Sequence, residues 1–141
     1  MMENKDKGFT LIELLIIIAI ISILSAIALV NYSKIKQVVY KNAVRTDLKN
    51  SLTMIIGFNT TYGGWPSSGI CGPGPKTCNL SDGTHSLVNG INVSRDVIIS
   101  WSITYNACPD KSDRLLIIGK HSKVNNWSAT FDSCNNKFSG F

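Results

Sequence analysis

The stretch Gly8-Phe9-Thr10-Leu11-Ile12-Glu13 lies between a charged leader, Met1 to Lys7, and an apolar run that continues from Leu14 to Val30. As a helix, the 22 residues from Phe9 to Val30 would extend about 33 Å, which is enough to cross the roughly 30 Å hydrocarbon core of a bilayer. Glu13 is the one charged residue in this run. A carboxylate at the start of such a helix is costly in lipid and therefore indicates a function.

The G-F-T-L-I-E motif and the Ile/Leu/Ala-rich run after it resemble the class III signal of type IV pilins and their relatives. These relatives are the pseudopilins of type II secretion and the minor pilins of competence systems. The resemblance covers about the first 30 residues. It implies that a membrane prepilin peptidase cuts between Gly8 and Phe9 and methylates the new amino terminus. Gly8 and Phe9 are thus the expected processing site, and residues 1–8 the expected leader peptide.

Residues 9–30 are expected to form a transmembrane helix that becomes the filament core. Members of the family often have a helix-perturbing proline at the position of Val30, and the first proline of this chain is Pro66. Interior proline costs roughly 3 kcal/mol of helix stability. We therefore expect this helix to remain continuous further than in relatives that have the proline.

The chain of 141 residues has the length of one domain, and its formal net charge is +5. Removal of residues 1–8 would delete two lysines and two acidic residues, so the processed chain stays basic. A modest positive charge is compatible with DNA or an anionic surface, although solubility alone explains it. All four cysteines follow the apolar run, as expected for a head delivered to an oxidising compartment.

Residues 31–57 are expected to continue the helix into water as an amphipathic segment. Two apolar groups lie on it, roughly 130° apart around the helix axis. The first group contains Ile35, Val39 and Ala43, and the second contains Leu48, Leu52, Ile55 and Ile56. We infer that the first half of this segment faces neighbouring subunits and that the second half lies under the sheet of the head.

Four basic residues, Lys34, Lys41, Arg45 and Lys49, fall within an arc of about 80° on the same helix. A solvated face is the simplest interpretation of this basic stripe. Contact with an acidic neighbour or with nucleic acid is the alternative.

Residues 58–141 are expected to form a soluble head. A Gly/Pro/Ser-rich loop is predicted from Gly57 to Ser86. Four strands are predicted after it: Ser86–Ser94, which the turn signal Asn89-Gly90 can split, then Val97–Tyr105, Arg114–Gly119 and Asn126–Phe131. The prediction is an α+β fold in which one long N-terminal helix packs on a small antiparallel sheet of three or four strands. The resemblance implies the same arrangement, the pilin fold.

The four cysteines allow three disulfide pairings. We favour Cys71 with Cys78, across a turn that contains two prolines and two glycines, and Cys108 with Cys134. Loop-closure entropy assigns about 2.5 kcal/mol to the first bond and about 3.6 kcal/mol to the second. In the family that the chain resembles, a disulfide that bounds a C-terminal surface region is common.

The sequence offers no catalytic constellation, and we expect neither enzyme activity nor a cofactor. His85 and His121 have no nucleophile or acid partner in sequence. Asp110, Asp113 and Asp132 give a weak calcium signal of the kind found in C-terminal loops of some pseudopilins, and no metal site is expected from it.

The function expected from these features is that of a structural subunit of a type IV pilus, acting in adhesion, motility or surface contact. Glu13 would pair with the amino group freed at Phe9 of a neighbour and so set the register of assembly. The expected partners are identical subunits, prepilin peptidase, the pilus or secretion assembly machinery and the inner membrane before assembly, with DNA as a further candidate. The expected location is the inner membrane for the precursor and an extracellular filament after assembly. A type II secretion pseudopilin and a DNA-receptor minor pilin are the alternatives.

Overall fold

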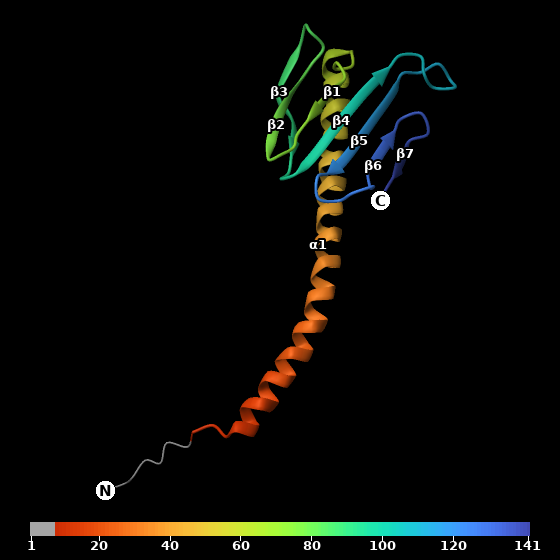
Figure 1. Ribbon diagram of the computed structural model, residues 1–141. Helices are drawn as coiled ribbons and strands as arrows, with labels where there is room; N and C mark the ends of the chain where they lie inside the picture. The colour runs from red at the N-terminus through yellow and green to blue at the C-terminus, as the bar shows by residue number, and fades with distance from the viewer. Residues whose placement is uncertain (1–7) are drawn as a thin grey trace. The chain divides into compact units, whose positions relative to one another are not determined.

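The computed structural model describes residues 8–141, so the predicted leader lies outside the described residues except for Gly8. The elements in chain order are α1 (Leu11–Tyr62), β1 (Gly69–Cys71), β2 (Lys76–Ser81), β3 (Ser86–Val93), β4 (Val97–Thr104), β5 (Arg114–His121), β6 (Ala129–Asp132) and β7 (Lys137–Ser139) (Figure 1). The chain forms two compact units, one ending at Lys36 and one running from Gln37 to Phe141. Residues of α1 belong to both units, and each unit is described by itself.

The helix α1 is one continuous element of 52 residues. Its continuity through Val30 agrees with the absence of proline there. It ends at Tyr62, beyond the predicted end at Gly57. In the last turn, the hydroxyls of Thr60 and Thr61 donate to the carbonyls of Ile56 and Gly57. Gly63 then ends the helix with a positive φ of 72° and an N–H bond to the Asn59 carbonyl.

Two antiparallel sheets follow the helix. The larger sheet has five strands in the order β1-β4-β5-β6-β7, and the smaller is the β2-β3 hairpin. In the larger sheet, β4 and β5 pair along the whole length of both strands, with Trp101 opposite Ile117. The α+β class is therefore confirmed, but the main sheet has five strands instead of the predicted three or four.

The core of the head lies between the sheet and the second unit's part of α1. Alternate residues of β4 and β5 point toward the helix, which is the period expected of a sheet covered on one face. The helix contributes Val44, Leu48, Ile55 and Phe58, and the strands contribute chiefly Val97, Ile99, Trp101, Leu115 and Ile117. The second half of the predicted amphipathic segment does lie under the sheet, but Ile56, placed in that group from the sequence, is 45% exposed.

Gly119 allows the helix and the sheet to approach closely. A Cβ at this position in β5 would lie 2.6 Å from Cγ1 of Val44 and 3.0 Å from Cδ1 of Ile99. The contact with Val44 is shorter than carbon atoms tolerate, and the contact with Ile99 would require that side chain to shift. The absence of a side chain at Gly119 therefore sets how near α1 lies to the sheet.

Three strands were missed from the sequence. The predicted loop from Gly57 to Ser86 contains β1 and β2, and β7 follows the last predicted strand. The Asn89-Gly90 turn signal does not split β3. The strand continues through Asn89, which has a positive φ of 56° and whose N–H donates to Oδ1 of Asn79. A register shift between Cys78 and Leu80 of the partner strand accommodates this irregularity.

The two disulfides have the pairing favoured from the sequence. Cys71–Cys78 joins β1 of the large sheet to β2 of the hairpin, and Cys108–Cys134 joins the β4–β5 connection to the segment after β6. The bonds thus link segments that the strand ladders alone do not hold together.

Candidate functional site

The predicted assembly residues lie at the start of α1. Phe9 is 80% exposed, and Glu13 sits in the first turn of the helix. The Thr10 N–H donates to Glu13 Oε2 at 2.9 Å, and the Glu13 N–H donates to Thr10 Oγ1 at 3.3 Å. This reciprocal pair is a capping box, which satisfies two of the backbone donors left open at a helix start. Sequence reasoning missed this second role, although the T-x-x-E spacing signals it.

The surface of α1 after Glu13 is apolar and uncovered within its unit. Every side chain described between residues 9 and 29 is exposed. The hydroxyls of Ser22 and Ser25 bond to carbonyls one turn earlier, those of Ile18 and Ile21, at 2.7 Å each. A hydroxyl that is satisfied inside its own helix can enter an apolar environment at little cost. By length and composition, α1 contains a stretch that could cross a membrane.

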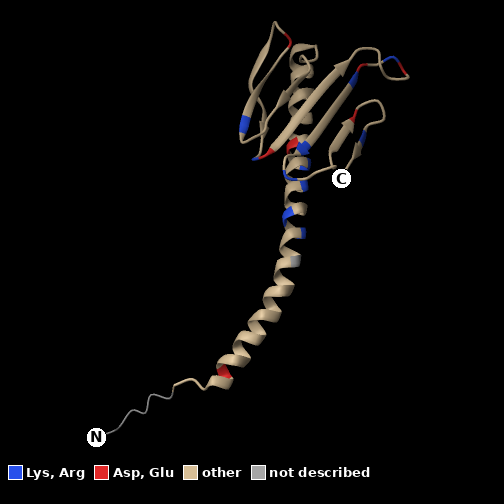
Figure 2. Cartoon of the chain, in the orientation of Figure 1, with Lys and Arg blue, Asp and Glu red and all other residues tan. Residues whose placement is uncertain are grey.

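The residues of the basic stripe divide between the two units. Lys34 lies in the unit that ends at Lys36, while Lys41, Arg45 and Lys49 lie in the unit of the head. Figure 2 shows basic residues gathered along the middle of α1.

The three head-unit cations of the stripe contact the aromatic rings of the C-terminal part of the chain. Lys41 and Arg45 lie 5.5 and 5.6 Å from the Trp127 ring, and Arg45 and Lys49 lie 5.7 and 5.3 Å from the Phe141 ring. Arg45 Nε also donates to the Gly140 carbonyl at 3.0 Å. These cations therefore hold the end of the chain against α1, a use that the sequence interpretation did not include.

Known proteins match both the motif and part of the head. The family model described as the prokaryotic N-terminal methylation motif matches residues 4–29. The type IV major fimbrial protein FimA of Dichelobacter nodosus is 33% identical over 99 residues, covering 64% of this chain. The chain thus has the N-terminal methylation motif and is similar, over part of its length, to a type IV major fimbrial protein.

Two further proteins are similar to part of the chain. A fimbrial protein of Moraxella nonliquefaciens is 33% identical over 90 residues, covering 64% of this chain. The type IV major pilin protein PilA of Myxococcus xanthus is 47% identical over 45 residues, covering 32% of it. The chain spans 49% of the Moraxella protein, 62% of the Dichelobacter protein and 20% of the Myxococcus protein. No solved structure matches the chain.

The three aspartates of the weak calcium signal each have a partner in the head. Asp132 pairs with Arg114, Asp110 accepts from the Ser112 hydroxyl at 2.6 Å, and Asp113 accepts from the Asn106 N–H at 3.1 Å. Within residues 8–141, no three His, Cys, Asp or Glu side chains are grouped as metal ligands would be. The arrangement accordingly gives no support to the calcium interpretation.

The two histidines stack on tyrosines of α1. His85 stacks on Tyr62 with ring centroids 4.6 Å apart and pairs with Asp82 at 3.0 Å. His121 is buried and stacks on Tyr40 at 4.3 Å, and its Nδ1 accepts the Lys123 N–H at 3.1 Å. Burial lowers the pKa of His121, so its ring remains neutral at physiological pH. Both rings therefore serve as packing groups for the connections they belong to.

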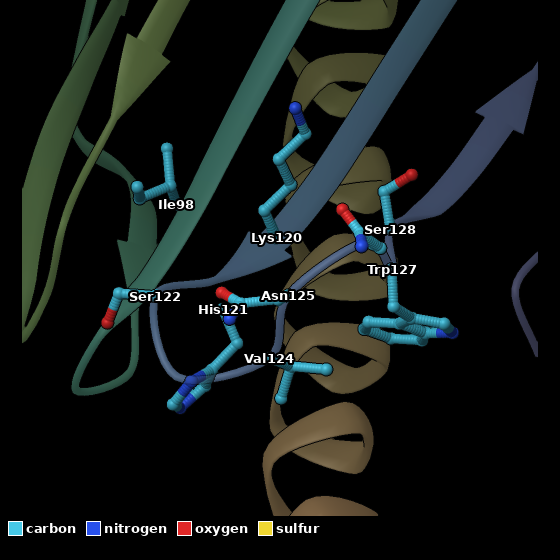
Figure 3. Close-up of a pocket in the computed structure, with 9 residues that line it drawn as sticks. Ile98, Lys120, His121, Ser122, Val124, Asn125, Trp127 and Ser128 are labelled. Atoms are coloured by element: carbon cyan, nitrogen blue, oxygen red, sulfur yellow. The ribbon is translucent and has the colours of Figure 1, made fainter.

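A pocket of about 440 Å³ lies at the end of β5 and under the β5–β6 connection. Figure 3 shows Ile98 and Ser122 on one side, Trp127 and Ser128 on the other, and Lys120 between them. No sequence motif marked this pocket, because its residues are individually ordinary and only the turn after His121 brings them together.

Proposed function

We propose that the chain is a structural subunit of a type IV pilus, made as an inner-membrane precursor, cut by prepilin peptidase between Gly8 and Phe9, and polymerised outside the cell through α1. The observation that carries this proposal is a wholly exposed apolar helix surface that contains one carboxylate, Glu13. Such a surface requires burial against lipid or against copies of itself. The names of the matched relatives, which are fimbrial proteins and major pilins, support burial against copies of the same helix.

Glu13 supports a specific register for this assembly. A carboxylate costs about 2.5–3.5 kcal/mol at the centre of a bilayer and less near its edge, so the membrane-bound precursor tolerates it. In a dry bundle of helices, an unpaired carboxylate is more costly, and the amino group freed at Phe9 of a neighbour is a cation at the matching end of the helix. Within residues 8–141, Glu13 Oε2 accepts the Thr10 N–H, and no hydrogen bond reaches the other carboxylate oxygen. That oxygen is available to a neighbouring subunit.

The two alternative functions have weaker support. A secretion pseudopilin with a metal-bearing C-terminal loop is not favoured, because Asp110, Asp113 and Asp132 each have another partner. A DNA-receptor pilin that binds through the basic stripe is not favoured, because Lys41, Arg45 and Lys49 already contact aromatic rings of the head.

The mass of the subunit in sheared surface material tests the proposal. The expected subunit begins at Phe9 with a methylated amine, has 133 of the 141 residues and dominates the sheared fraction. Gly8→Leu, which obstructs the cut, should leave the leader attached and the subunit in the membrane. An abundant extracellular subunit that retains residues 1–8 would overturn the proposed processing, and a trace amount in sheared filaments would overturn the role as main subunit.

A further inference from the structure

The pocket at the end of β5 is not needed for assembly through α1, and the chemistry of its side chains suits a small-molecule ligand. Nine residues line it: Ile98, Lys120, His121, Ser122, Val124, Asn125, Asn126, Trp127 and Ser128. Its volume of about 440 Å³ lies within the range of roughly 300–1,000 Å³ typical of small-molecule sites. The pocket is open to solvent, and the polar side chains of Lys120, Ser122, Asn125 and Asn126 are exposed.

The polar side chains of the pocket are uncommitted. Within residues 8–141, the side chains of Lys120, Ser122, Asn125, Asn126 and Ser128 make no hydrogen bond or ion pair with the protein. Some other hydroxyls of the head are bonded within it, as the Ser94 hydroxyl is to Asp47 and the Ser133 hydroxyl is to the Leu115 N–H. Around this pocket, two amides, two hydroxyls and one ammonium line the same hollow and are all available to a ligand.

The turn that forms the pocket is held in place by contacts with Tyr40 of α1 and with Asp96. His121 is fixed by its stack on Tyr40 of α1. The Ser122 N–H bonds to the Asp96 carbonyl at 2.9 Å, and the Val124 N–H bonds to the His121 carbonyl at 3.0 Å. Lys123 also pairs with Asp96 at 3.0 Å. A site built on such a fixed turn loses little conformational entropy when a ligand binds.

We propose that this pocket binds an acidic saccharide unit, such as a uronic acid residue of a polysaccharide. Asn125 and Asn126 supply both donors and acceptors, and the two serines do the same, which matches the adjacent hydroxyls of a sugar ring. The half-buried indole of Trp127 offers an apolar wall for the carbon face of the ring. Lys120 supplies the one cation of the lining, which suits a single carboxylate.

The same lining disfavours a nucleic acid. Binding to a phosphate backbone requires several cations along a track, whereas Lys120 is the one Lys or Arg among the pocket residues. Lys123, in the same turn, is paired with Asp96, and Lys41 and Arg45 face the Trp127 ring. The balance of one charge and many neutral hydrogen-bonding groups therefore favours a sugar.

Calorimetric titration of the full-length chain in detergent micelles tests this proposal. The probes are a hyaluronan hexasaccharide, which contains glucuronic acid, and the neutral hexamer of N-acetylglucosamine. Lys120→Gln should weaken hyaluronan binding about tenfold or more, because it removes a charge-assisted hydrogen bond, and should leave neutral-sugar binding unchanged. Asn125→Ala should weaken both. Lys76→Gln and Asn135→Ala are matched controls, because both residues are exposed and lie outside the pocket.

Three results would overturn the proposal. One is the absence of saturable binding of either saccharide at millimolar concentration. Another is equal weakening by Lys120→Gln and Lys76→Gln, which would indicate general charge attraction. The third is tighter binding of single-stranded oligothymidylate than of hyaluronan, with the same dependence on Lys120, which would assign the pocket to nucleic acid. Filament yield of each variant is measured in parallel, and since α1 is unaltered it should match wild type whether or not the saccharide binds.

Discussion

At the scale of single residues, two carboxylates on α1 show how differently the same group is used. Asp47 is buried and accepts from both the Ser94 N–H at 2.7 Å and the Ser94 hydroxyl at 3.1 Å. Its partners are in the same chain, so it fixes α1 to the connection between β3 and β4. Glu13 has one acceptor oxygen committed to Thr10 and one free of hydrogen bonds within residues 8–141. That difference makes Asp47 a residue of the fold and Glu13 a candidate for contact between subunits.

The first prediction concerns the pH dependence that Asp47 adds to stability. Burial raises the pKa of Asp47 above its ordinary value of 3.8, while the bonds from Ser94 act in the opposite direction. The folded state therefore binds the proton more tightly than the unfolded state. The contribution of Asp47 is fully present below pH 3.8 and decreases as pH rises through the raised pKa.

Urea unfolding of wild type and Asp47→Asn at a series of pH values, followed by tryptophan fluorescence, checks this prediction. The stability of wild type relative to Asp47→Asn should decline with rising pH and then level off. The comparison cancels the contributions of the other carboxylates, such as the half-buried Asp82, whose pKa hydrogen bonds from His85 lower to about 2. A relative stability that increases with pH would show that the hydrogen bonds outweigh the burial.

At the scale of elements, the sequence predicts those whose hydrophobic pattern is long and regular. The continuous apolar run predicts the start of α1, and the apolar stretches Val97–Tyr105 and Arg114–Gly119, predicted as strands, correspond to β4 and β5. The strands β1 and β7 have three residues each, and β2, Lys-Thr-Cys-Asn-Leu-Ser, has little strand propensity. These strands form because a neighbour offers a free edge. Asn126, taken from the sequence as the start of a strand, has a positive φ of 55° and lies in the preceding turn.

A pair of glycine substitutions tests the close packing of α1 on the sheet. Gly119→Ala should destabilise the head by about 1–3 kcal/mol, since the added methyl group would overlap the stiff side chain of Val44. Gly57→Ala is the matched control, because Gly57 lies inside α1 with nothing within 4 Å of a Cβ. It should stabilise the chain by about 0.5–1 kcal/mol through helix propensity. The midpoints of urea unfolding measure both, and a neutral Gly119→Ala would contradict the packing argument.

The two disulfides give a further prediction at this scale. Cys108–Cys134 closes a longer segment than Cys71–Cys78, with sequence separations of 26 and 7. On the loop-entropy model, paired Cys→Ser replacement should lower the free energy of unfolding by about 3.6 kcal/mol for Cys108–Cys134 and by about 2.5 kcal/mol for Cys71–Cys78. Unfolding of the two double variants under oxidising conditions checks the order. Equal losses would indicate that native contacts around the bonds, and not loop closure, determine their value.

At the scale of the whole molecule, the chain contains a unit with a core of its own and a unit without one. Residues 37–141 bury a continuous cluster of apolar side chains, whereas the described side chains of residues 8–36 are all exposed. The sequence places its divisions after Val30 and after Gly57, whereas the two units meet between Lys36 and Gln37, inside the predicted amphipathic segment. It predicts the processing site and Glu13 through one local motif. It does not predict the pocket beside Trp127, since the pocket depends on how the turn after His121 folds beside Ile98 of β4, which no local pattern encodes.

We expect Glu13 to assemble the filament through its charge and not through its place in the capping box. Glu13→Gln separates the two roles, because glutamine at this position can also close a capping box with Thr10 but cannot pair with an amino group. Removing one partner of a buried ion pair costs about 3–5 kcal/mol. Glu13→Leu removes both roles, and Glu13→Asp keeps the charge on a shorter side chain.

The decisive measurement is the yield of sheared surface filaments from cells that express Glu13→Gln, compared with the amount of the same subunit in the membrane. We predict normal membrane insertion for every variant, loss or disorder of filaments for Glu13→Gln and Glu13→Leu, and an intermediate yield for Glu13→Asp. Filaments of Glu13→Gln at the wild-type yield would show that the capping box suffices and that the charge of Glu13 does not direct assembly.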